Sequence, residues 1–153
     1  MIDLELNSSR DLKREGKSFY WASFFLPKNS KKKAGTLYSI CRYFDDIADM
    51  HSEDQTNYLK DTIEEIKKNK NNKINIFFQK NEINNSIFID LIEGLILDQK
   101  KIRIQNKQEL IKYSYHVAGT VGLMMSKIIG VKNKDAAKSA IDLGIGMQLT
   151  NIA

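Results

Sequence analysis

The stretch LYSICRYFDDIAD, from Leu37 to Asp49, places three carboxylates and one arginine within two turns of a predicted helix. Asp45 and Asp49 are one turn apart, a spacing at which two like charges on a helix repel by about 0.2–0.5 kcal/mol. Asp46 adds a third negative charge, and all three lie near the predicted C-terminus of the helix, where the helix dipole disfavours anions. We therefore expect an external partner to offset this repulsion.

A helical wheel of this stretch places the acids beside the core. One side carries Tyr38, Cys41, Arg42, Asp45 and Asp49, and the adjoining apolar stripe is Leu37, Ile40, Phe44, Ile47 and Ala48. Two such carboxylates can hold a hard cation, since Mg²⁺ takes one or two protein carboxylates and completes its shell with water and phosphate oxygens. The stretch thus indicates a metal-bound phosphate ester. The alternative is a solvated acidic face in which Arg42 pairs with Asp45 or Asp46.

The composition is typical of one globular domain with a substantial core, at 153 residues, 42% hydrophobic and 28% charged. The single cysteine, Cys41, excludes an internal disulfide and is interpreted as a small buried apolar residue. Asp3 and Glu5 interrupt the opening and no apolar h-region follows, so we expect no signal peptide. No run approaches the roughly 18 apolar residues of a membrane span. We expect a cytoplasmic protein.

The net charge of +5 lies largely in lysine clusters at Lys28, at Lys31 to Lys33, and between Lys67 and Lys73. Asparagine is mixed with these lysines and no aromatics are interleaved, so we interpret them as solvated surface and not as a nucleic-acid interface. A second interpretation is peripheral contact with anionic lipid, where each cation contributes about 1 kcal/mol. A nucleic-acid binder is the weakest of the alternatives.

The periodic segments predict helices throughout the chain. The expected helices start at Ser8 or Ser9 and end at Leu26 before Pro27, then start at Asn29 or Ser30, at Thr56, at Asn85 or Ser86, at Asn106 with a stop at Gly130, and at Asn133 or Asp135. The stretch from Asn69 to Lys73 is expected to be a loop. The segment IRIQ, from Ile102 to Gln105, alternates but is too brief to imply a sheet.

Paired glycines interrupt the last two predicted helices, Gly119 with Gly122 and Gly144 with Gly146. Each costs about 1 kcal/mol relative to alanine in a helix, so each needs a reason. Close helix packing is the favoured interpretation, and a long apolar ligand lying against this surface is the alternative.

Several polar side chains have a structural and a ligand-binding interpretation. Gln148 and Asn151 project from one face of an apolar helix, where they either bond a neighbouring helix or bind a metal-bound diphosphate. Tyr113 and Tyr115 either bind the same ligand or are partly buried tyrosines whose hydroxyls contact water, which is common. A phosphate could approach Gly16 or Ser18, but Ser18 could equally bond within its own helix. His116 is interpreted as structural.

Four stretches together resemble one family, the squalene and phytoene synthases, which join prenyl diphosphates head to head. They are KSFYWASFFLP (Lys17 to Pro27), LYSICRYFDDIAD (Leu37 to Asp49), YSYHVAGTVGLMM (Tyr113 to Met125) and LGIGMQLTNIA (Leu143 to Ala153). They occur in the family's order with similar gaps. The segments VAGTVGLMM and GMQLTNIA most resemble those of the bacterial phytoene synthases.

The resemblance implies an all-α, isoprenoid-synthase-type helical bundle with a central active-site cavity. It implies Asp45 and Asp49 as ligands of Mg²⁺, with Mn²⁺ as a substitute, and catalytic roles for Arg42 and Tyr113. The substrate-binding positions that it implies are Ser18, Tyr38, Arg42, Tyr113, Val117, Gly122, Gln148 and Asn151. Gly16 stands where some family members have a phosphate-contacting serine.

The implied reaction condenses two molecules of geranylgeranyl diphosphate to phytoene, the carotenoid precursor, through a cyclopropyl diphosphate. One alternative is the same chemistry on farnesyl diphosphate, giving squalene or dehydrosqualene, and another is a non-catalytic assembly protein. The chain stops at Ala153, just before the family's second acidic motif would come. We therefore expect the N-terminal part of a single helical domain, without turnover by residues 1–153 alone.

Overall fold

A computed structural model describes the backbone of residues 17–99 and 104–152, and the side chains from Tyr20 on. The described residues form helices and no strand, which confirms the all-α prediction. In chain order the elements are α2 (Lys17–Ala22), the 3₁₀ turn η1 (Ser23–Phe25), α3 (Lys28–Ala48), α4 (Glu53–Lys68), α5 (Lys73–Lys80), α6 (Asn85–Asp98), α7 (Lys107–Ser114), the π-helical turn η2 (Tyr115–Gly119), α8 (Thr120–Ile128) and α9 (Lys134–Ile152).

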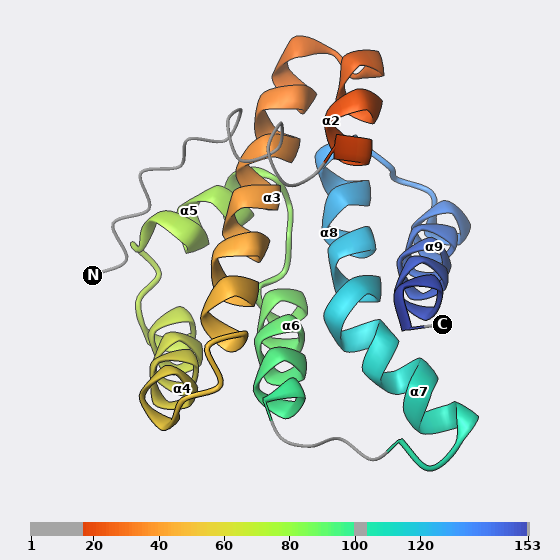
Figure 1. Ribbon diagram of the computed structural model, residues 1–153. Helices are drawn as coiled ribbons and strands as arrows, with labels where there is room; N and C mark the ends of the chain where they lie inside the picture. The colour runs from red at the N-terminus through yellow and green to blue at the C-terminus, as the bar shows by residue number, and fades with distance from the viewer. Residues whose placement is uncertain (1–16, 100–103, 153) are drawn as a thin grey trace.

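Helices α3, α6 and α9 pack around α8. Helices α3, α6 and α9 run in the same direction and α8 runs against them, in contact with all three (Figure 1). The C-terminal ends of α3 and α6, which carry acidic residues, therefore lie at the same end of the molecule. None of the helices in the described ranges is both long and apolar enough to span a bilayer.

The core forms where the sequence predicts it. The whole apolar stripe of α3 is buried, namely Leu37, Ile40, Phe44, Ile47 and Ala48. Phe44 and Phe78 both meet the ring of Phe88 edge-on, at centroid distances of 5.3 and 5.0 Å. Such edge-to-face pairs add to the stabilisation from burial alone.

The start of α3 differs from the prediction. Pro27 is its N-cap and the helix begins at Lys28, so Asn29 and Ser30 lie inside the first turn and neither is the cap. The first helical hydrogen bond sets this start, because the N–H of Lys31 donates to the carbonyl of Pro27 at 2.9 Å. The preceding helix ends where expected, since η1 stops at Phe25 and Leu26 is extended. Its expected start at Ser8 or Ser9 lies outside the described residues.

The region around α4 and α5 also corrects the prediction. Helix α4 starts before Thr56, because Ser52 caps it by accepting a hydrogen bond of 3.3 Å from the backbone N–H of Gln55. The loop after α4 ends at Asn72, whose side chain caps α5. We missed α5, a short helix that buries Ile74 and Phe78.

The later boundaries match the prediction. Helix α6 begins at Asn85, and α7 and α9 follow the capping residues Asn106 and Asn133. Ile104 and Gln105 have no regular structure, and the start of the IRIQ segment lies outside the described residues.

Two of the glycines allow η2 and α8 to pack closely against α9. A Cβ at Gly122 would lie 2.2 Å from the carbonyl oxygen of Ala140, and one at Gly144 would lie 2.4 Å from that of Ala118. Close packing therefore explains these two. It does not explain Gly146, where a Cβ would meet nothing within 4 Å.

Candidate functional site

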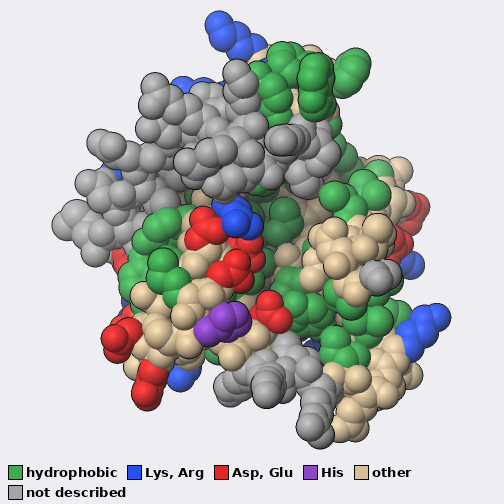
Figure 2. Space-filling model, in the orientation of Figure 1, with side chains coloured by type: hydrophobic (Ala, Val, Ile, Leu, Met, Phe, Trp, Pro, Cys, Tyr) green, Lys and Arg blue, Asp and Glu red, His purple; other side chains and the backbone are tan. Residues whose placement is uncertain are grey.

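A cavity of about 650 Å³ lies among α3, α6, α7, η2, α8 and α9. Its walls are mainly apolar and include Leu91, Leu95, Val121, Met125, Ile129 and Leu143. Acidic side chains gather beside a hollow with apolar lining on the face shown in Figure 2. A cavity of this size, apolar with a few convergent polar groups, is typical of a small-molecule site.

The cavity brings together almost all of the site residues expected from the sequence. Those that line it are Tyr38, Arg42, Asp45, Tyr113, Val117, Gly122, Gln148 and Asn151. They come from five different elements, far apart in the chain. Ser18 belongs to α2, but its side chain lies outside the described ones. The roles of all these residues in binding or catalysis stay predictions.

The acidic end of α3 is arranged around one arginine. Arg42 forms ion pairs of 2.8 Å with both Asp45 and Asp46, through its two terminal nitrogens. Both pairings considered for the sequence are therefore present. Asp49 is the exposed C-cap of α3 and lies outside the cavity lining. Burial, followed by the negative charge of Asp49, raises the pKa of Asp45 despite the opposing effect of Arg42.

The sequence analysis missed Asp98, which lines the same cavity from the end of α6. Its Oδ1 accepts a hydrogen bond of 2.9 Å from the hydroxyl of Tyr113, and its charge also raises the pKa of Asp45. The sequence did contain a signal for Asp98. An aspartate at the C-terminal end of an apolar helix is disfavoured by the helix dipole and by its apolar neighbours, so it suggests a functional role.

Tyr113 is held as a hydrogen-bond donor. Burial is the largest cause that raises its pKa, and the hydrogen bond to Asp98 and the charge of that carboxylate raise it further. Hydrogen bonding with Gln148 acts in the opposite direction. The phenol is therefore protonated at neutral pH, at a position between the carboxylates of α3 and α6 and the amide of α9.

Gln99 fixes the distance between the two acidic helix ends. Its Nε2 donates a hydrogen bond of 3.1 Å to the carbonyl of Ala48 at the end of α3, and its Oε1 accepts one from Thr56 of α4. Gln99 directly follows Asp98, so its hydrogen bond to Ala48 holds the end of α6 against the last turn of α3, which carries the aspartates.

The donor set at this end suits a hard divalent cation. Asp45 and Asp49 offer carboxylate oxygens one turn apart. Burial first, and then the negative charge of Asp49, raise the pKa of Asp45, and a bound cation would neutralise that charge. Among the described residues, no three Asp, Glu, His or Cys side chains are grouped so that they could hold a metal alone. A cation here would need further oxygens from water or a phosphate group, as Mg²⁺ commonly does.

Two further groups near the cavity have structural explanations. Burial raises the pKa of the Cys41 thiol to about 12, so this wall residue stays protonated. His116 Nδ1 lies 2.9 Å from the carbonyl oxygen of Asp90, and the Tyr115 hydroxyl donates to the Asp90 carboxylate at 3.4 Å. Neither ring lines the cavity, and the structural interpretation of His116 agrees with this contact.

The π-helical turn η2 could not be foreseen from the sequence. The N–H of Thr120 bonds the carbonyl of Tyr115, five residues earlier, which inserts an extra residue into an otherwise continuous helix. Val117 and Ala118, within this turn, both line the cavity. The local change of pitch thus shapes the cavity wall opposite α3.

Comparison with known proteins points to the family that the four sequence stretches resemble. Residues 12–153 match the family model described as squalene/phytoene synthase. The chain is 32% identical to a 15-cis-phytoene synthase of Enterobacter agglomerans, with 90% of this chain and 52% of the relative covered. It is 31% identical to a phytoene synthase of Thermus thermophilus, covering 94% of this chain and 52% of the relative.

A solved structure is also similar. A crystal structure of a dehydrosqualene synthase in complex with a ligand superposes with a TM-score of 0.82 at 28% identity, covering 95% of this chain and 54% of that one. The chain thus spans about half the length of the relatives it matches. Sequence and fold agree, and the chain belongs to the squalene/phytoene synthase family.

Proposed function

We propose that the protein containing this chain joins two molecules of geranylgeranyl diphosphate head to head to form phytoene. The observation that carries the proposal is the cavity itself, whose apolar walls meet Arg42, Asp45, Asp98 and Tyr113 at one place. A prenyl diphosphate has an apolar tail and a charged head, which match the apolar walls and the polar end of this cavity. The similarity to phytoene synthases supports the choice of product.

The first chemical step breaks the bond between the allylic carbon and the diphosphate oxygen, and the electron pair leaves with the diphosphate. Arg42 is placed to bind the departing anion, because its guanidinium is a planar, permanently charged donor. Tyr113 is protonated at neutral pH, and its hydroxyl would donate a hydrogen bond to the same group after turning away from Asp98. Gln148 and Asn151 add amide donors from α9.

Asp45 and Asp49 would hold Mg²⁺, with Mn²⁺ as a substitute. A bound divalent cation supplies charge neutralisation for the diphosphate leaving group. Ionised carboxylates are required for this, and the pKa of Asp45 is raised by its surroundings. Binding should therefore strengthen as the pH rises through the titration of Asp45.

The carbocation that remains needs surroundings without competing nucleophiles. Many of the walls are leucine, isoleucine, valine and methionine side chains, and in the complete protein they would help to exclude water. Cys41 is the one thiol of the chain, and its high pKa keeps it in the poorly nucleophilic protonated form. The second prenyl chain is then the nearest available source of electrons.

Farnesyl diphosphate is the second candidate substrate. The similarity to a dehydrosqualene synthase structure favours it, since that protein's name indicates a thirty-carbon product. The depth of the complete cavity would select between the two chain lengths. A non-catalytic assembly role is a third candidate, which the joint presence of Arg42, Asp45 and Tyr113 in one cavity disfavours.

Because the chain spans about half of its relatives, we propose activity for a complete polypeptide and expect none from residues 1–153 alone. The test incubates both with Mg²⁺ and labelled geranylgeranyl or farnesyl diphosphate, and identifies the hydrocarbon formed. Turnover by residues 1–153 would show that no further carboxylates are needed. Release of diphosphate without any hydrocarbon would indicate simple hydrolysis and would contradict the condensation.

A further inference from the structure

The segment from α7 through η2 to α8 is one continuous helical run, residues 107–128, that changes direction at η2 (Figure 1). Its cavity-lining residues recur at every fourth position. One row holds Tyr113, Val117, Val121 and Met125, and a second row holds Ala118, Gly122 and Ser126. A straight α-helix does not keep every fourth residue on one face, so the rows need an explanation.

Without η2, the helix would turn Tyr113 away from its row. With about 3.6 residues per turn, four residues rotate by about 400°, so each step drifts by about 40°. From Tyr113 to Met125 the drift would be about 120°, which puts the tyrosine on another face. The extra residue of the π-helical turn takes back about 100° and leaves about 20°. The whole row, Tyr113 included, then faces the cavity.

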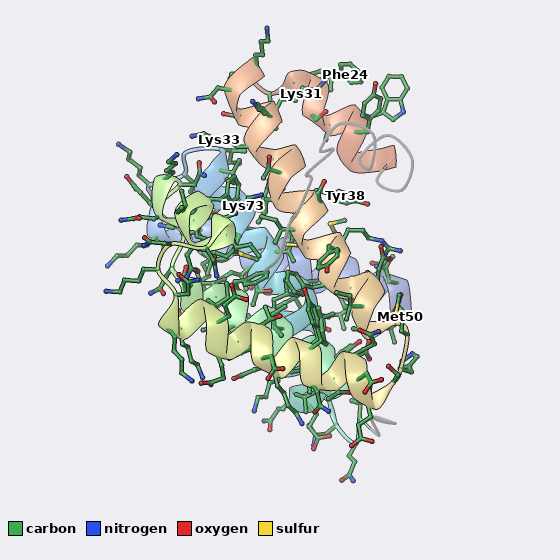
Figure 3. The ribbon with its side chains drawn as sticks, turned by 90° about the vertical axis from the view of Figure 1, so that its left-hand side faces the viewer. Phe24, Lys31, Lys33, Tyr38, Met50 and Lys73 are labelled. Carbon is green, nitrogen blue, oxygen red and sulfur yellow. The ribbon has the colours of Figure 1, made fainter. Side chains whose placement is uncertain are left out.

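The direction of Tyr113 matters because its hydroxyl donates a hydrogen bond of 2.9 Å to Asp98 at the polar end of the cavity. Helix α3 forms the opposite wall. Figure 3 shows Tyr38 partway along α3 and Met50 just past its end, so Asp45 lies between them. A tyrosine rotated by about 100° around the axis of α7 would lose its contact with Asp98 and leave the cavity lining.

The π-helical turn changes which backbone groups are paired. In an α-helix the N–H of Thr120 would bond the carbonyl four residues earlier, that of His116. Here that N–H bonds the carbonyl of Tyr115 instead. The hydroxyl of Thr120, a residue with 0% of its surface exposed, donates a hydrogen bond of 2.7 Å to the His116 carbonyl. This bond is stabilising, because a buried carbonyl without a partner is costly.

The neighbouring helices leave room for the wider turn. On α6, a Cβ at Gly94 would lie 2.6 Å from the Cβ of His116, and on α9 one at Gly144 would lie 2.4 Å from the carbonyl oxygen of Ala118. The ring of His116 is also anchored, since its Nδ1 lies 2.9 Å from the carbonyl oxygen of Asp90. The turn is therefore part of the packing between α6 and α9.

We propose that η2 directs Tyr113 into the cavity and that Thr120 is the positioning residue that stabilises this turn. The catalytic consequence rests on the proposed function, whereas the geometric claim does not. The alternative is a threonine that merely bonds the carbonyl one turn earlier, as Thr62 does with Tyr58 at 2.9 Å in α4. Thr120 differs because its own N–H is bonded elsewhere, so its hydroxyl replaces a missing backbone bond.

The experiment removes this hydroxyl. Thr120→Val keeps the shape of the side chain but leaves the His116 carbonyl without its side-chain donor, so the turn should revert toward α-helical pairing and rotate Tyr113. NMR of ring-labelled tyrosine should then show a lower pKa for Tyr113, because burial and the neighbouring Asp98 no longer raise it. Thr120→Ser retains a hydroxyl and should leave this titration unchanged.

Thr62→Val is the matched control. Thr62 is 3% exposed and its hydroxyl makes the same kind of bond within the regular helix α4, so its loss should leave Tyr113 unchanged. Circular dichroism checks that each variant is folded. Thr120→Ala removes the same hydroxyl with less bulk and supplies the measurement if the valine variant does not fold. None of these measurements requires turnover, so failure of the proposed reaction leaves this test intact.

Kinetics of the complete polypeptide test the catalytic consequence. Thr120→Val should lower kcat about tenfold and change KM much less, as expected for a bond made in the transition state. Combined with Tyr113→Phe, the same substitution should cause no further loss, because Thr120 acts through the tyrosine. Independent, additive losses in the double variant would contradict that route.

Three results of the titration would overturn the proposal. One is an unchanged pKa of Tyr113 in folded variants that lack the Thr120 hydroxyl. Another is an equal change in Thr62→Val, which would indicate a general effect of losing a buried hydroxyl. The third is a change in Thr120→Ser as large as that in Thr120→Val. A shifted titration in protein that forms no hydrocarbon from any prenyl diphosphate would contradict the proposed function alone.

Discussion

The hydroxyl of Tyr113 donates a hydrogen bond of 2.9 Å to Oδ1 of Asp98, and this bond joins α7 to the end of α6. Both residues line the cavity that Asp45 enters from α3. The carboxylate raises the pKa of the phenol, so the pair holds a proton next to a cluster of negative charge. Asp98 therefore positions Tyr113 and adds to the charge that a cation would neutralise.

The first prediction concerns this pair. Asp98→Asn should lower the pKa of Tyr113 toward its ordinary value, because the substitution removes a negative charge and weakens the hydrogen bond to the phenol. NMR of ring-labelled tyrosine measures the titration. Asp90→Asn, which removes the carboxylate that raises the pKa of Tyr115, is the matched control and should leave Tyr113 unchanged. Identical titration of Tyr113 in both variants would contradict the assignment.

In the complete protein, Tyr113→Phe should reduce kcat by about ten- to a hundredfold, the range expected for loss of a hydrogen bond to a charged group. The KM should change much less if the bond strengthens as the diphosphate departs. An equal effect on substrate binding and turnover would instead make Tyr113 a ground-state contact. Steady-state kinetics with purified diphosphates distinguish the two.

The third prediction follows from the raised pKa of Asp45. A carboxyl with a higher pKa in the folded than in the unfolded chain loses stabilising effect as pH rises through that interval. Asp45→Asn should therefore increase the free energy of unfolding at pH 7, by about 0.5 kcal/mol from the like-charge pair alone. The gain should vanish near pH 3, where the carboxyl is protonated in both states. Urea unfolding at the two pH values measures this, and a gain confined to low pH would have the wrong sign.

Magnesium with diphosphate should raise the Tm of the chain. A ligand at a hundredfold its Kd contributes about 2.7 kcal/mol. Asp45→Asn and Asp49→Asn should remove most of the effect, because these are the two proposed ligands. Asp46→Asn should retain it, since Asp46 pairs with Arg42 and is not a proposed ligand. Thermal unfolding with Mg²⁺, Mn²⁺ or neither tests this. Equal loss in all three variants would indicate a diffuse charge effect and no defined ligands.

The glycines of α9 give a stability prediction with an internal control. Gly144→Ala should destabilise the chain by about 1–3 kcal/mol, because its Cβ would lie 2.4 Å from a backbone oxygen that cannot move independently. Gly146→Ala, on the same helix with open space around it, should stabilise the chain by up to about 1 kcal/mol. Chemical denaturation measures both, and a similar effect at the two positions would contradict the packing against Ala118.

The sequence was sufficient for the features that depend on local periodicity and on recognisable motifs. The apolar stripe of α3 repeats at helical spacing, so its burial and the direction of Asp45 and Arg42 followed directly. The glycine spacing likewise indicated close packing, which holds for Gly122 and Gly144.

Features that depend on tertiary contacts could not be predicted from local sequence patterns. Helix α5 is short and surrounded by asparagine and lysine, and packing of Ile74 and Phe78 stabilises it. The position of Asp98 at the end of an apolar helix was a signal, but its hydrogen bond with Tyr113 depends on α7 bringing the tyrosine to it. The π-helical turn depends on how η2 packs against α6 and α9, which no periodicity encodes.

The most direct test of the proposed function is product analysis. The complete polypeptide, supplied with Mg²⁺ and labelled geranylgeranyl diphosphate, should yield a forty-carbon phytoene with release of two diphosphates per product, and Asp45→Asn should abolish it. A thirty-carbon hydrocarbon from farnesyl diphosphate, with none from geranylgeranyl diphosphate, would contradict phytoene synthesis. Absence of any hydrocarbon from either substrate would contradict the catalytic role of the cavity.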